Sequence, residues 1–343
     1  MSSPLYDAIQ IHNDKKRVSM HMPAHKGCAR PLSPLAQLLP FDLTELPDTG
    51  SLFDFEGPTA AAEELAAELF GTESTFMSAG GCTLCIQAML RVAVPNGGKV
   101  ISGRLIHRSA VNAMALLCIE PIWIYPDSSA SEYFSGRTEP EIVRQALNKN
   151  PDAKAVYVTS PDYFGVMSDI EALAKVAGEH NVPLLVDNAH GAHLKFLKED
   201  MSPTTLGAAM SADSAHKTLP VLTGGAWLQI ADKSMAEAAK QAMALFGSTS
   251  PSYPILLSLD MARDWLAQGA REEFARLEQQ VGEIAELLKS AGAEMPKGPK
   301  DPMRVVFAAE ERASKAIGEK LRTSGIEPEY AGVGGVILIP SVM

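Results

Sequence analysis

The sequence of 343 residues lacks the features that mark secreted, membrane-spanning and nucleic-acid-binding proteins. Its N-terminus has neither the basic start nor the apolar core of a signal peptide. It has no uninterrupted apolar run of about 18 residues, which excludes a transmembrane helix. No long basic run occurs, and 41 acidic against 30 basic residues give a net charge of −11. We therefore expect a cytoplasmic protein that binds neither nucleic acid nor membranes, and an acidic surface that suits a cationic small substrate.

Cysteine is also scarce. The chain has four: Cys28, Cys82, Cys85 and Cys118. In a cytoplasmic protein we expect all of them to be reduced thiols. Cys82 and Cys85 form a Cys-x-x-Cys pair, but no second pair with metal-binding spacing accompanies it. We therefore expect no metal site, and interpret the pair as two small residues on the first turn of a helix.

From about residue 56 to residue 230, predicted helices alternate with predicted strands. The helices are expected at 58–70, 82–94, 107–117, 139–148 and 169–180, and the strands at 75–78, 99–102, 121–125, 153–159, 182–186 and 226–230. Residues 182–186 show no polar alternation, as expected for a strand that is covered on both faces. This order predicts an α/β fold with a mostly parallel sheet.

Differences in composition and in predicted secondary structure divide the chain into three regions. Residues 1–50 are rich in proline and predicted to be an irregular N-terminal arm that packs on another part of the protein or on a second subunit. Residues 51–255 form the predicted large domain. Residues 256–343 form a predicted smaller α+β domain, with a long charged helix at 255–288 and strands at 303–308 and 335–339. The chain stops directly after an apolar strand, so we expect a truncated C-terminal domain.

Lys217 and Asp187 carry the strongest chemical signal. Lys217 lies on a short polar turn, where its amine can form a Schiff base with an aldehyde. Asp187 ends the strand 182–186, at the sheet edge where α/β folds bind ligands. A carboxylate there can hold a pyridinium nitrogen, and the two residues together are what pyridoxal phosphate (PLP) requires. The structural alternatives are a surface lysine in a loop and an aspartate that caps the following segment.

Several segments could hold the phosphate group of such a cofactor. Residues 80–83, Gly-Gly-Cys-Thr, join a predicted strand to a helix, and N–H groups at a helix N-terminus bind anions. Ser214, His216 and Thr218 surround the lysine with further donors. The hydroxyl-rich segment 248–253 is either another phosphate contact or a helix cap.

Other residues could contact the cofactor ring. Ala189 is small enough to lie flat against it. His190 or His193 could reach the ring hydroxyl or the substrate, although His193 is more typical of a structural histidine. His107, where a strand meets a helix, could stack on the ring or donate a proton, and its alternative is an ordinary residue at a helix N-terminus.

In their order along the chain, these motifs resemble those of the Orn/Lys/Arg decarboxylases, a bacterial group with a fold-type-I PLP domain. The matching segments are His-Met-Pro-Ala-His-Lys-Gly at 21–27, Asp-Asn-Ala-His-Gly-Ala-His at 187–193, Ser-Ala-His-Lys-Thr-Leu-Pro at 214–220, and residues 42–45, 56–58, 69–71, 75–76, 159–165 and 249–253. They cover roughly residues 17–260.

The resemblance implies an aspartate aminotransferase-like fold and the decarboxylation of lysine, arginine or ornithine, as in polyamine biosynthesis. It implies that Lys217 forms the Schiff base with PLP, that Asp187 pairs with the pyridine nitrogen and that His107 stacks on the ring. Ala189 would lie on the opposite face of the ring, and His190 near its hydroxyl group.

The resemblance also assigns the phosphate contacts. Ser214 and His216 would hold the phosphate together with the turn Gly81, Cys82 and Thr83. Thr249 would reach the phosphate of a partner subunit, because the family builds its sites at the interface of a homodimer or larger homo-oligomer.

Two departures from the family pattern stand out. The phosphate turn usually reads Asn-Gly-Ser-Thr, whereas here Cys82 puts a thiol, a weaker donor, in place of a serine hydroxyl. We therefore expect weaker cofactor affinity. Asn188 replaces a glutamate that commonly follows the aspartate.

Several alternatives stay open. The same lysine and aspartate serve aminotransferases and carbon–sulfur lyases, and a fold alone does not choose among them. The altered phosphate turn also allows a catalytically weak homologue with a regulatory role. A nicotinamide enzyme is disfavoured, because no Gly-x-Gly-x-x-Gly opens the first βα unit. Glu45, Asp48 and Asp54 are the candidates to bind the distal cation of a basic substrate, chosen only by their location in or next to the arm.

Overall fold

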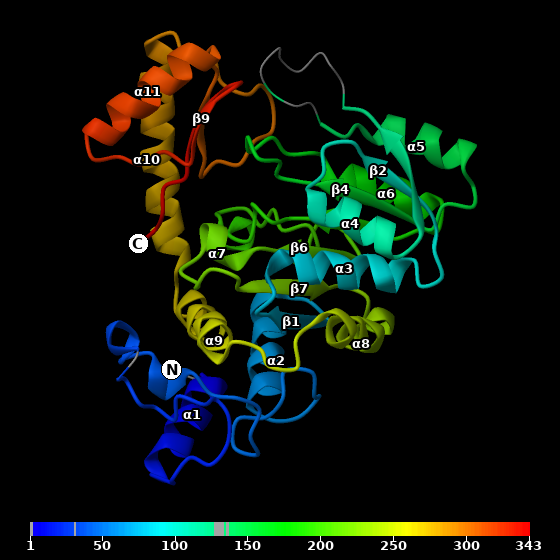
Figure 1. The fold of residues 1–343 in the computed structure, drawn as a ribbon. Helices are drawn as coiled ribbons and strands as arrows, with labels where there is room; N and C mark the ends of the chain where they lie inside the picture. Colours follow the sequence, from blue (N-terminus) through cyan, green and yellow to red (C-terminus); the bar gives the residue numbers. More distant parts are fainter. Residues whose placement is uncertain (1–2, 31, 127–133, 135–136) are drawn as a thin grey trace.

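The computed structural model describes residues 3–30, 32–126, 134 and 137–343. These residues build a seven-stranded sheet flanked by helices and a separate three-stranded sheet (Figure 1). Within the described ranges, no helix is both long and apolar enough to cross a membrane.

The large sheet has the strand order β1-β7-β6-β5-β4-β2-β3. Its strands are β1 (Ser74–Ser78), β2 (Gly98–Gly103), β3 (Ile119–Ile124), β4 (Ala155–Thr159), β5 (Leu184–Asp187), β6 (Met210–Asp213) and β7 (Ala226–Ile230). β7 runs antiparallel to its neighbours β1 and β6, and the other neighbouring pairs are parallel. The predicted class, α/β with a mostly parallel sheet, is therefore confirmed.

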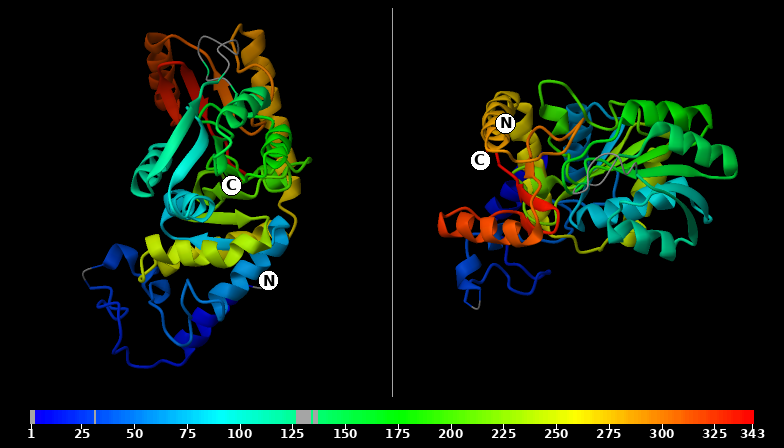
Figure 2. Two further views of the ribbon diagram at one scale, coloured as in Figure 1. Left: turned by 90° about the vertical axis from the view of Figure 1, so that its right-hand side faces the viewer. Right: turned by 90° about the horizontal axis from the view of Figure 1, so that it is seen from above.

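Two layers of helices cover the two faces of this sheet (Figure 2). One layer contains α3 (Gly81–Ala93), α4 (Arg108–Leu116) and α8 (Ala236–Phe246), and the other contains α5 (Pro140–Lys149) and α6 (Ile170–Glu179). β4 shows the alternation behind this arrangement. Ala155 and Tyr157 pack with the first layer, whereas Val156 and Val158 pack with the second. β4 is buried on both faces, which is why it shows no polar alternation.

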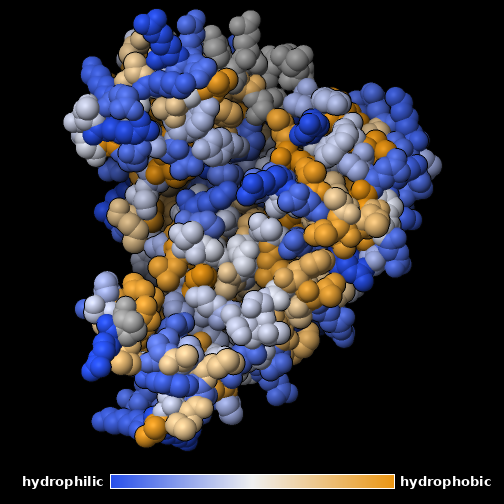
Figure 3. All heavy atoms as spheres, viewed as in Figure 1, coloured by the Kyte–Doolittle hydropathy of each residue, from blue (hydrophilic) through white to orange (hydrophobic). Residues whose placement is uncertain are grey.

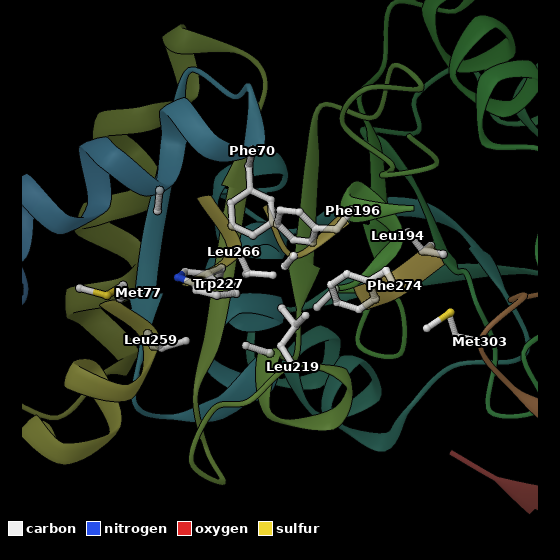
Figure 4. Close-up of a cluster of buried hydrophobic side chains, with 14 of the residues drawn as sticks. Phe70, Met77, Leu194, Phe196, Leu219, Trp227, Leu259, Leu266, Phe274 and Met303 are labelled. Atoms are coloured by element: carbon white, nitrogen blue, oxygen red, sulfur yellow. The ribbon is translucent and has the colours of Figure 1, made fainter. Parts of the chain in front are cut away.

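A second set of helices packs beside the antiparallel part of the sheet. These are α1 (Pro4–Asp14), α2 (Pro58–Phe70), α9 (Tyr253–Ala267) and α10 (Arg271–Ser290). Figure 4 shows the core that joins them, in which Phe70 lies against Trp227 at 5.1 Å between ring centroids. Phe196 stacks on Phe274 of α10 in the same cluster, so the core continues from the large sheet toward the small one.

The small sheet is antiparallel, with the order β8-β10-β9. Its strands are β8 (Val305–Phe307), β9 (Tyr330–Gly332) and β10 (Gly335–Leu338), accompanied by α11 (Glu311–Thr323). The strands predicted at 303–308 and 335–339 are therefore confirmed. The division at residue 255 stays a prediction, because α9 and α10 run without a linker between the two sheets (Figure 1).

Short helical turns complete the chain: α7 (Ala215–Thr218), η1 (Ser33–Leu35), η2 (Leu39–Phe41), η3 (Leu194–Phe196) and η4 (Lys233–Met235). The expected irregular arm is wrong for α1, where Leu5 and Ile9 lie four residues apart on one face and are fully buried. The single helix expected at 255–288 is wrong as well. It breaks before Arg271 because Gly269 adopts a positive φ of 112°, which no helix accommodates.

Candidate active site

A pocket of about 540 Å³ lies at the carboxyl edge of the parallel strands. β4 ends in Thr159 and β5 in Asp187, and these two residues are paired in register. Ser214 follows the end of the next strand, β6. All three line the pocket, because parallel strands end at the same edge of a sheet. Of the residues that the family resemblance assigns to the cofactor, all except Thr249 line it as well: Gly81, Cys82, Thr83, His107, Asp187, Ala189, His190, Ser214, His216 and Lys217.

Lys217 lies on α7, a single helical turn after β6, where a short polar turn was expected. Its Nζ atom is 3.1 Å from Nε2 of His190. The neighbouring His216 donates from Nδ1 to the carbonyl oxygen of Gly225 at 3.0 Å, and its Nδ1 is 3.3 Å from Oγ of Ser214. The turn that carries the lysine is thereby tied to the start of β7.

Asp187 is 1% exposed and faces the pocket from the end of β5. Its Oδ1 accepts from the backbone N–H of Ala189 at 3.2 Å, and its Oδ2 accepts from the hydroxyl group of Tyr157 at 3.2 Å. Burial raises the pKa of Asp187, while the hydrogen bonds from the Ala189 N–H and the Tyr157 hydroxyl group act in the opposite direction. A buried carboxylate gains most from a cationic partner, and a ring N–H⁺ in the pocket would supply one.

A second buried carboxylate, Asp213, lies beside the first on β6. Burial raises the pKa of Asp213 to about 6. Its Oδ1 accepts from Nδ2 of Asn188 at 2.9 Å, so the residue that departs from the family pattern acts as a donor to this carboxylate. An ionised glutamate has no proton to donate at that position, which gives the asparagine a structural reason.

His107 is the N-cap residue of α4. Its Nδ1 accepts from the backbone N–H of Ser109 at 3.3 Å and lies 2.8 Å from Oγ of the same serine. The structural alternative for this histidine is therefore correct, and the residue also lines the pocket. Its stacking on a cofactor ring stays a prediction.

The phosphate turn begins α3. Gly81 has φ of +68°, which favours glycine, and its N–H donates to the carbonyl oxygen of Gly224 at 2.8 Å. The phosphate would therefore rely on the backbone N–H groups of Cys82 and Thr83 in the first turn, which have no acceptor inside the helix. The thiol of Cys82 donates to the carbonyl oxygen of Ala212 at 3.3 Å. Burial raises the pKa of this thiol well above its usual range, so it stays protonated.

Further pocket atoms fit a phosphorylated pyridine aldehyde. The buried hydroxyl group of Thr159 lines the pocket and has no hydrogen-bond partner among the residues that the structure describes. With the amine of Lys217, the carboxylate of Asp187 and the helix N-terminus at Cys82, the pocket offers a group for each polar part of PLP.

The sequence did not reveal the contribution of Tyr157, Thr159 or Arg304. Tyr157 faces the same side of β4 as Ala155, so alternation along the strand was the signal that could have found it. Arg304 approaches His190 from the region of the small sheet, with NH2 at 3.3 Å from Nδ1 across 114 residues of sequence. No local sequence pattern indicates a contact between residues this far apart in the chain.

His190 is held as a neutral imidazole. Burial is the main cause that lowers the pKa of His190 to about 2, and the charge of Arg304 acts in the same direction. The edge of its ring also meets the ring of Tyr163, with 5.6 Å between centroids. His193, in contrast, is buried away from the pocket with Nε2 at 2.9 Å from Oδ1 of Asp301, and its interpretation as a structural histidine is confirmed.

The other predicted residues lie elsewhere. Thr249 is exposed and does not line the pocket of its own chain. The three candidates for the distal cation, Glu45, Asp48 and Asp54, do not line it either. Asp48 is engaged by His12, Lys15 and Arg17, and the hydrogen bond from Lys15 is the largest of the effects that lower the pKa of Asp48 to about 2. Its charge is therefore already neutralised within the arm.

Cys82 and Cys85 are both buried near the start of α3, as the interpretation of two small residues on a first helical turn required. Among the described residues, no group of three or more His, Cys, Asp or Glu side chains is arranged to hold a metal ion.

Comparison with known proteins adds independent observations. The model of the family described as Orn/Lys/Arg decarboxylase, major domain, matches residues 3–294. The arginine decarboxylase of Bacillus subtilis (strain 168) is 33% identical over 289 residues, which cover 81% of this chain and 59% of that protein. The uncharacterized protein YaaO of the same organism is 29% identical over an alignment 357 residues long, which covers 99% of this chain and 74% of that protein.

Solved structures have a similar fold. Lysine decarboxylase A from Pseudomonas aeruginosa matches with a TM-score of 0.83 and 19% identity, covering 99% of this chain and 57% of that chain. The chain thus spans little more than half the length of these decarboxylases. The predicted fold-type-I PLP-dependent transferase fold is confirmed by this likeness. The match over most of its length shows that the chain belongs to the Orn/Lys/Arg decarboxylase family.

Proposed function

We propose that this protein is a PLP-dependent decarboxylase that converts lysine, arginine or ornithine into the corresponding amine and CO2. The observation that carries the proposal is that Lys217 and Asp187, far apart in sequence, line one pocket at the carboxyl edge of the sheet. Family membership and relatives named arginine decarboxylase and lysine decarboxylase support the same activity. Such a reaction would serve polyamine biosynthesis in the cytoplasm.

The residues of the pocket take distinct roles in this proposal. Lys217 would hold the aldehyde carbon of PLP, and Asp187 would keep its ring nitrogen protonated through a charge-assisted hydrogen bond. His107 and Ala189 would lie on opposite faces of the ring, with His190 near its hydroxyl group. When bound, PLP supplies the electron sink that accepts the bonding electrons as CO2 leaves.

The surroundings of the pocket would orient the substrate and exclude water. Ser214, His216 and the N–H groups of the turn at Cys82 would anchor the phosphate, so that the reacting end stays over Lys217. The apolar side chains of the lining would limit the access of water: Ile86, Leu105, Ile106 and Phe164.

We also propose a homodimer with shared sites. Apolar side chains gather on the surface over α3 and α4, which Figure 3 shows, and the exposed ones there include Leu105, Val111 and Leu116. An exposed apolar surface of this kind is typical of an interface. Thr249 is exposed outside the pocket of its own chain, so it would be available to the phosphate in the partner's pocket.

The dimer is tested by complementation. We expect the variants Lys217→Ala and Thr249→Ala to be weak alone and to recover activity when they are unfolded and refolded together, because a mixed dimer contains one intact site. Light scattering would measure the mass of each preparation. A monomeric mass, or mixtures no more active than the sum of their parts, would contradict the shared site.

The activity is tested by spectrum and product. With PLP we expect a visible absorbance band, and after reduction with borohydride a peptide map should carry the label on Lys217. Lysine, arginine and ornithine are then offered in turn, with CO2 and the amine measured. Release of a keto acid in place of CO2 would identify an aminotransferase. A label on another lysine would refute the assignment of Lys217 as the lysine that binds PLP.

A further inference from the structure

A line of three side chains runs from the small sheet to the pocket. NH2 of Arg304 lies 3.3 Å from Nδ1 of His190, and Nε2 of the same histidine lies 3.1 Å from Nζ of Lys217. Arg304 immediately precedes β8, outside the segment matched by the family model. Along these contacts between described residues, only the imidazole ring of His190 separates the guanidinium of Arg304 from the amine of Lys217.

Arg304 has little freedom to turn away from the histidine. Its side chain is 1% exposed, and NH1 donates to the carbonyl oxygen of Tyr163 at 2.8 Å. Its Nε lies 3.6 Å from Oδ2 of Asp301, whose other oxygen is paired with His193 at 2.9 Å. The guanidinium is thus held by one hydrogen bond and one ion pair, and its NH2 group is directed at His190.

The donors and acceptors of the three side chains determine where each proton lies. A guanidinium has donors only, so Nδ1 of His190 must be the acceptor of its contact with Arg304. A neutral imidazole carries one proton, which then resides on Nε2 and points at Nζ of Lys217. An ammonium group has no lone pair with which to accept it, whereas an uncharged amine does. A ring nitrogen that accepts carries no proton, so the ring is neutral, and burial, which lowers the pKa of His190, favours the same state.

We propose that Arg304 is a positioning residue: by donating to Nδ1 it holds the proton of His190 on Nε2, and thereby presents Lys217 as an uncharged amine. Such an amine is the reactive form. Its lone pair forms the bond to a carbonyl carbon, and the carbonyl oxygen leaves as water with the two amine protons. The inference rests on the proposed function only for the identity of that carbonyl compound.

Other charged or titratable groups also influence this line. They are Asp301 and His107 near His190, and Asp187 and Cys82 near Lys217. Asp187 would favour an ammonium group on Lys217, so the contact with His190 has to oppose it. The tests therefore compare variants of Arg304 with these four residues unchanged.

The first test determines the position of the proton on His190 directly. The PLP-free full chain with ¹⁵N-labelled histidine is studied by long-range ¹H–¹⁵N NMR, and the signals of His190 are identified by their loss in His190→Gln. We expect a neutral ring protonated on Nε2 from pH 6 to pH 8. A proton on Nδ1, or a doubly protonated ring, would overturn the proposal.

The second test measures the amine itself. The PLP-free chain is labelled with trace acetic anhydride at a series of pH values, and acetylation of Lys217 is quantified by mass spectrometry. Arg304→Met should reduce acetylation of Lys217 at pH 7 about tenfold, as expected for the loss of one charge-assisted hydrogen bond, with recovery at high pH. Arg304→Lys, which keeps a cationic donor, should restore most of the reactivity.

Arg271→Met is the matched control. Arg271 begins α10 and donates to the carbonyl oxygens of Leu197 and Lys195, without a contact to His190. We expect its acetylation profile to match that of the unaltered chain. Equal profiles for Arg304→Met and the control, with both chains folded, would refute the proposal. Because labelling uses no PLP, a failure of the cofactor assay alone would count against the proposed function and leave this inference standing.

Discussion

The hydroxyl group of Tyr157 donates to Oδ2 of Asp187 at 3.2 Å from the adjacent strand of the sheet, and both side chains are buried. Tyr157 is fully buried, which raises the pKa of its hydroxyl group well above the usual range, so this group remains a donor. Together with the N–H of Ala189, it holds the carboxylate in one orientation toward the pocket. A ring nitrogen would meet an acceptor that is already positioned.

We expect Asp187→Ala to lower turnover at least about hundredfold, because a buried charge partner of this kind contributes about 3 kcal/mol or more. Asp169→Ala is the control, since Asp169 caps α6 away from the pocket. Steady-state CO2 release at saturating PLP measures both variants. Near-normal turnover of Asp187→Ala would refute the pairing with the ring nitrogen.

Tyr157→Phe should act more mildly. It removes one donor from Asp187 and leaves the carboxylate, so we expect about fivefold weaker PLP binding, in line with the loss of one hydrogen bond. The pKa of Asp187 should rise further, because the hydrogen bond from Tyr157 lowers it. PLP titration followed by absorbance gives the affinity, and an unchanged value would mean that the backbone N–H alone orients Asp187.

Cys82→Ser tests the altered phosphate turn. The sequence led us to expect weak cofactor affinity from this thiol, but its hydrogen bond is directed at Ala212 rather than at the pocket. A serine hydroxyl can take over the same bond, so we expect PLP affinity to change by no more than about twofold, less than one full hydrogen bond. A tenfold gain would show that the serine side chain binds the phosphate and that the thiol limits affinity.

The pH dependence of the free energy of unfolding should show that His190 is neutral in the folded chain. Its pKa is lowered from 6.5 to about 2 in the folded chain, so below pH 6.5 only the unfolded chain takes up the proton. The free energy of unfolding should therefore fall as the pH drops. Relative to His190→Asn, we expect a loss of about 2 kcal/mol between pH 7 and pH 5 for this single group.

Urea unfolding of the PLP-free protein at the two pH values measures this difference. His180→Asn, directly after α6, serves as the control histidine variant. If the unaltered chain and His190→Asn lose the same stability between pH 7 and pH 5, then His190 is not held neutral by its surroundings.

A buried ion pair should stabilise the region that leads to Thr249. Nζ of Lys240 on α8 lies 2.5 Å from Oε2 of Glu63 on α2, whose Oε1 accepts from the N–H of Met77 at 2.9 Å. Burial raises the pKa of Glu63 to about 7, and Lys240 opposes that rise. The same ammonium lies 4.8 Å from the ring centroid of Phe76. The pair therefore fastens two helices to the edge strand β1.

We expect Glu63→Gln and Lys240→Met each to lower the free energy of unfolding by about 3 kcal/mol, because each leaves an uncompensated buried group. The double variant should lose less than the sum of the two, since it removes the unpaired charge. Urea unfolding of all four chains completes the cycle. Additive losses would show that the pair has no coupling energy.

Local pattern was sufficient for most of the large sheet. The helix predicted at 58–70 matches α2, because Gly71 ends it with a left-handed residue. The strand predicted at 226–230 matches β7. β6 was not predicted, because its four residues, Met-Ser-Ala-Asp, have no apolar run, and burial between β5 and β7 is what makes them a strand.

The sequence by itself determined the fold class and the chemistry of the site. Alternating helices and apolar strands predict a mostly parallel sheet, parallel strands end at one edge, and Asp187 stands at such an end. Lys217 was singled out by its polar turn, because the strand before it, β6, was not predicted. Only the tertiary structure decided how those groups are protonated and oriented. Tyr157 reaches Asp187 across a strand pair, and Arg304 reaches His190 across 114 residues. Such contacts depend on which separate elements come together, and the periodicity of one element does not indicate its partner.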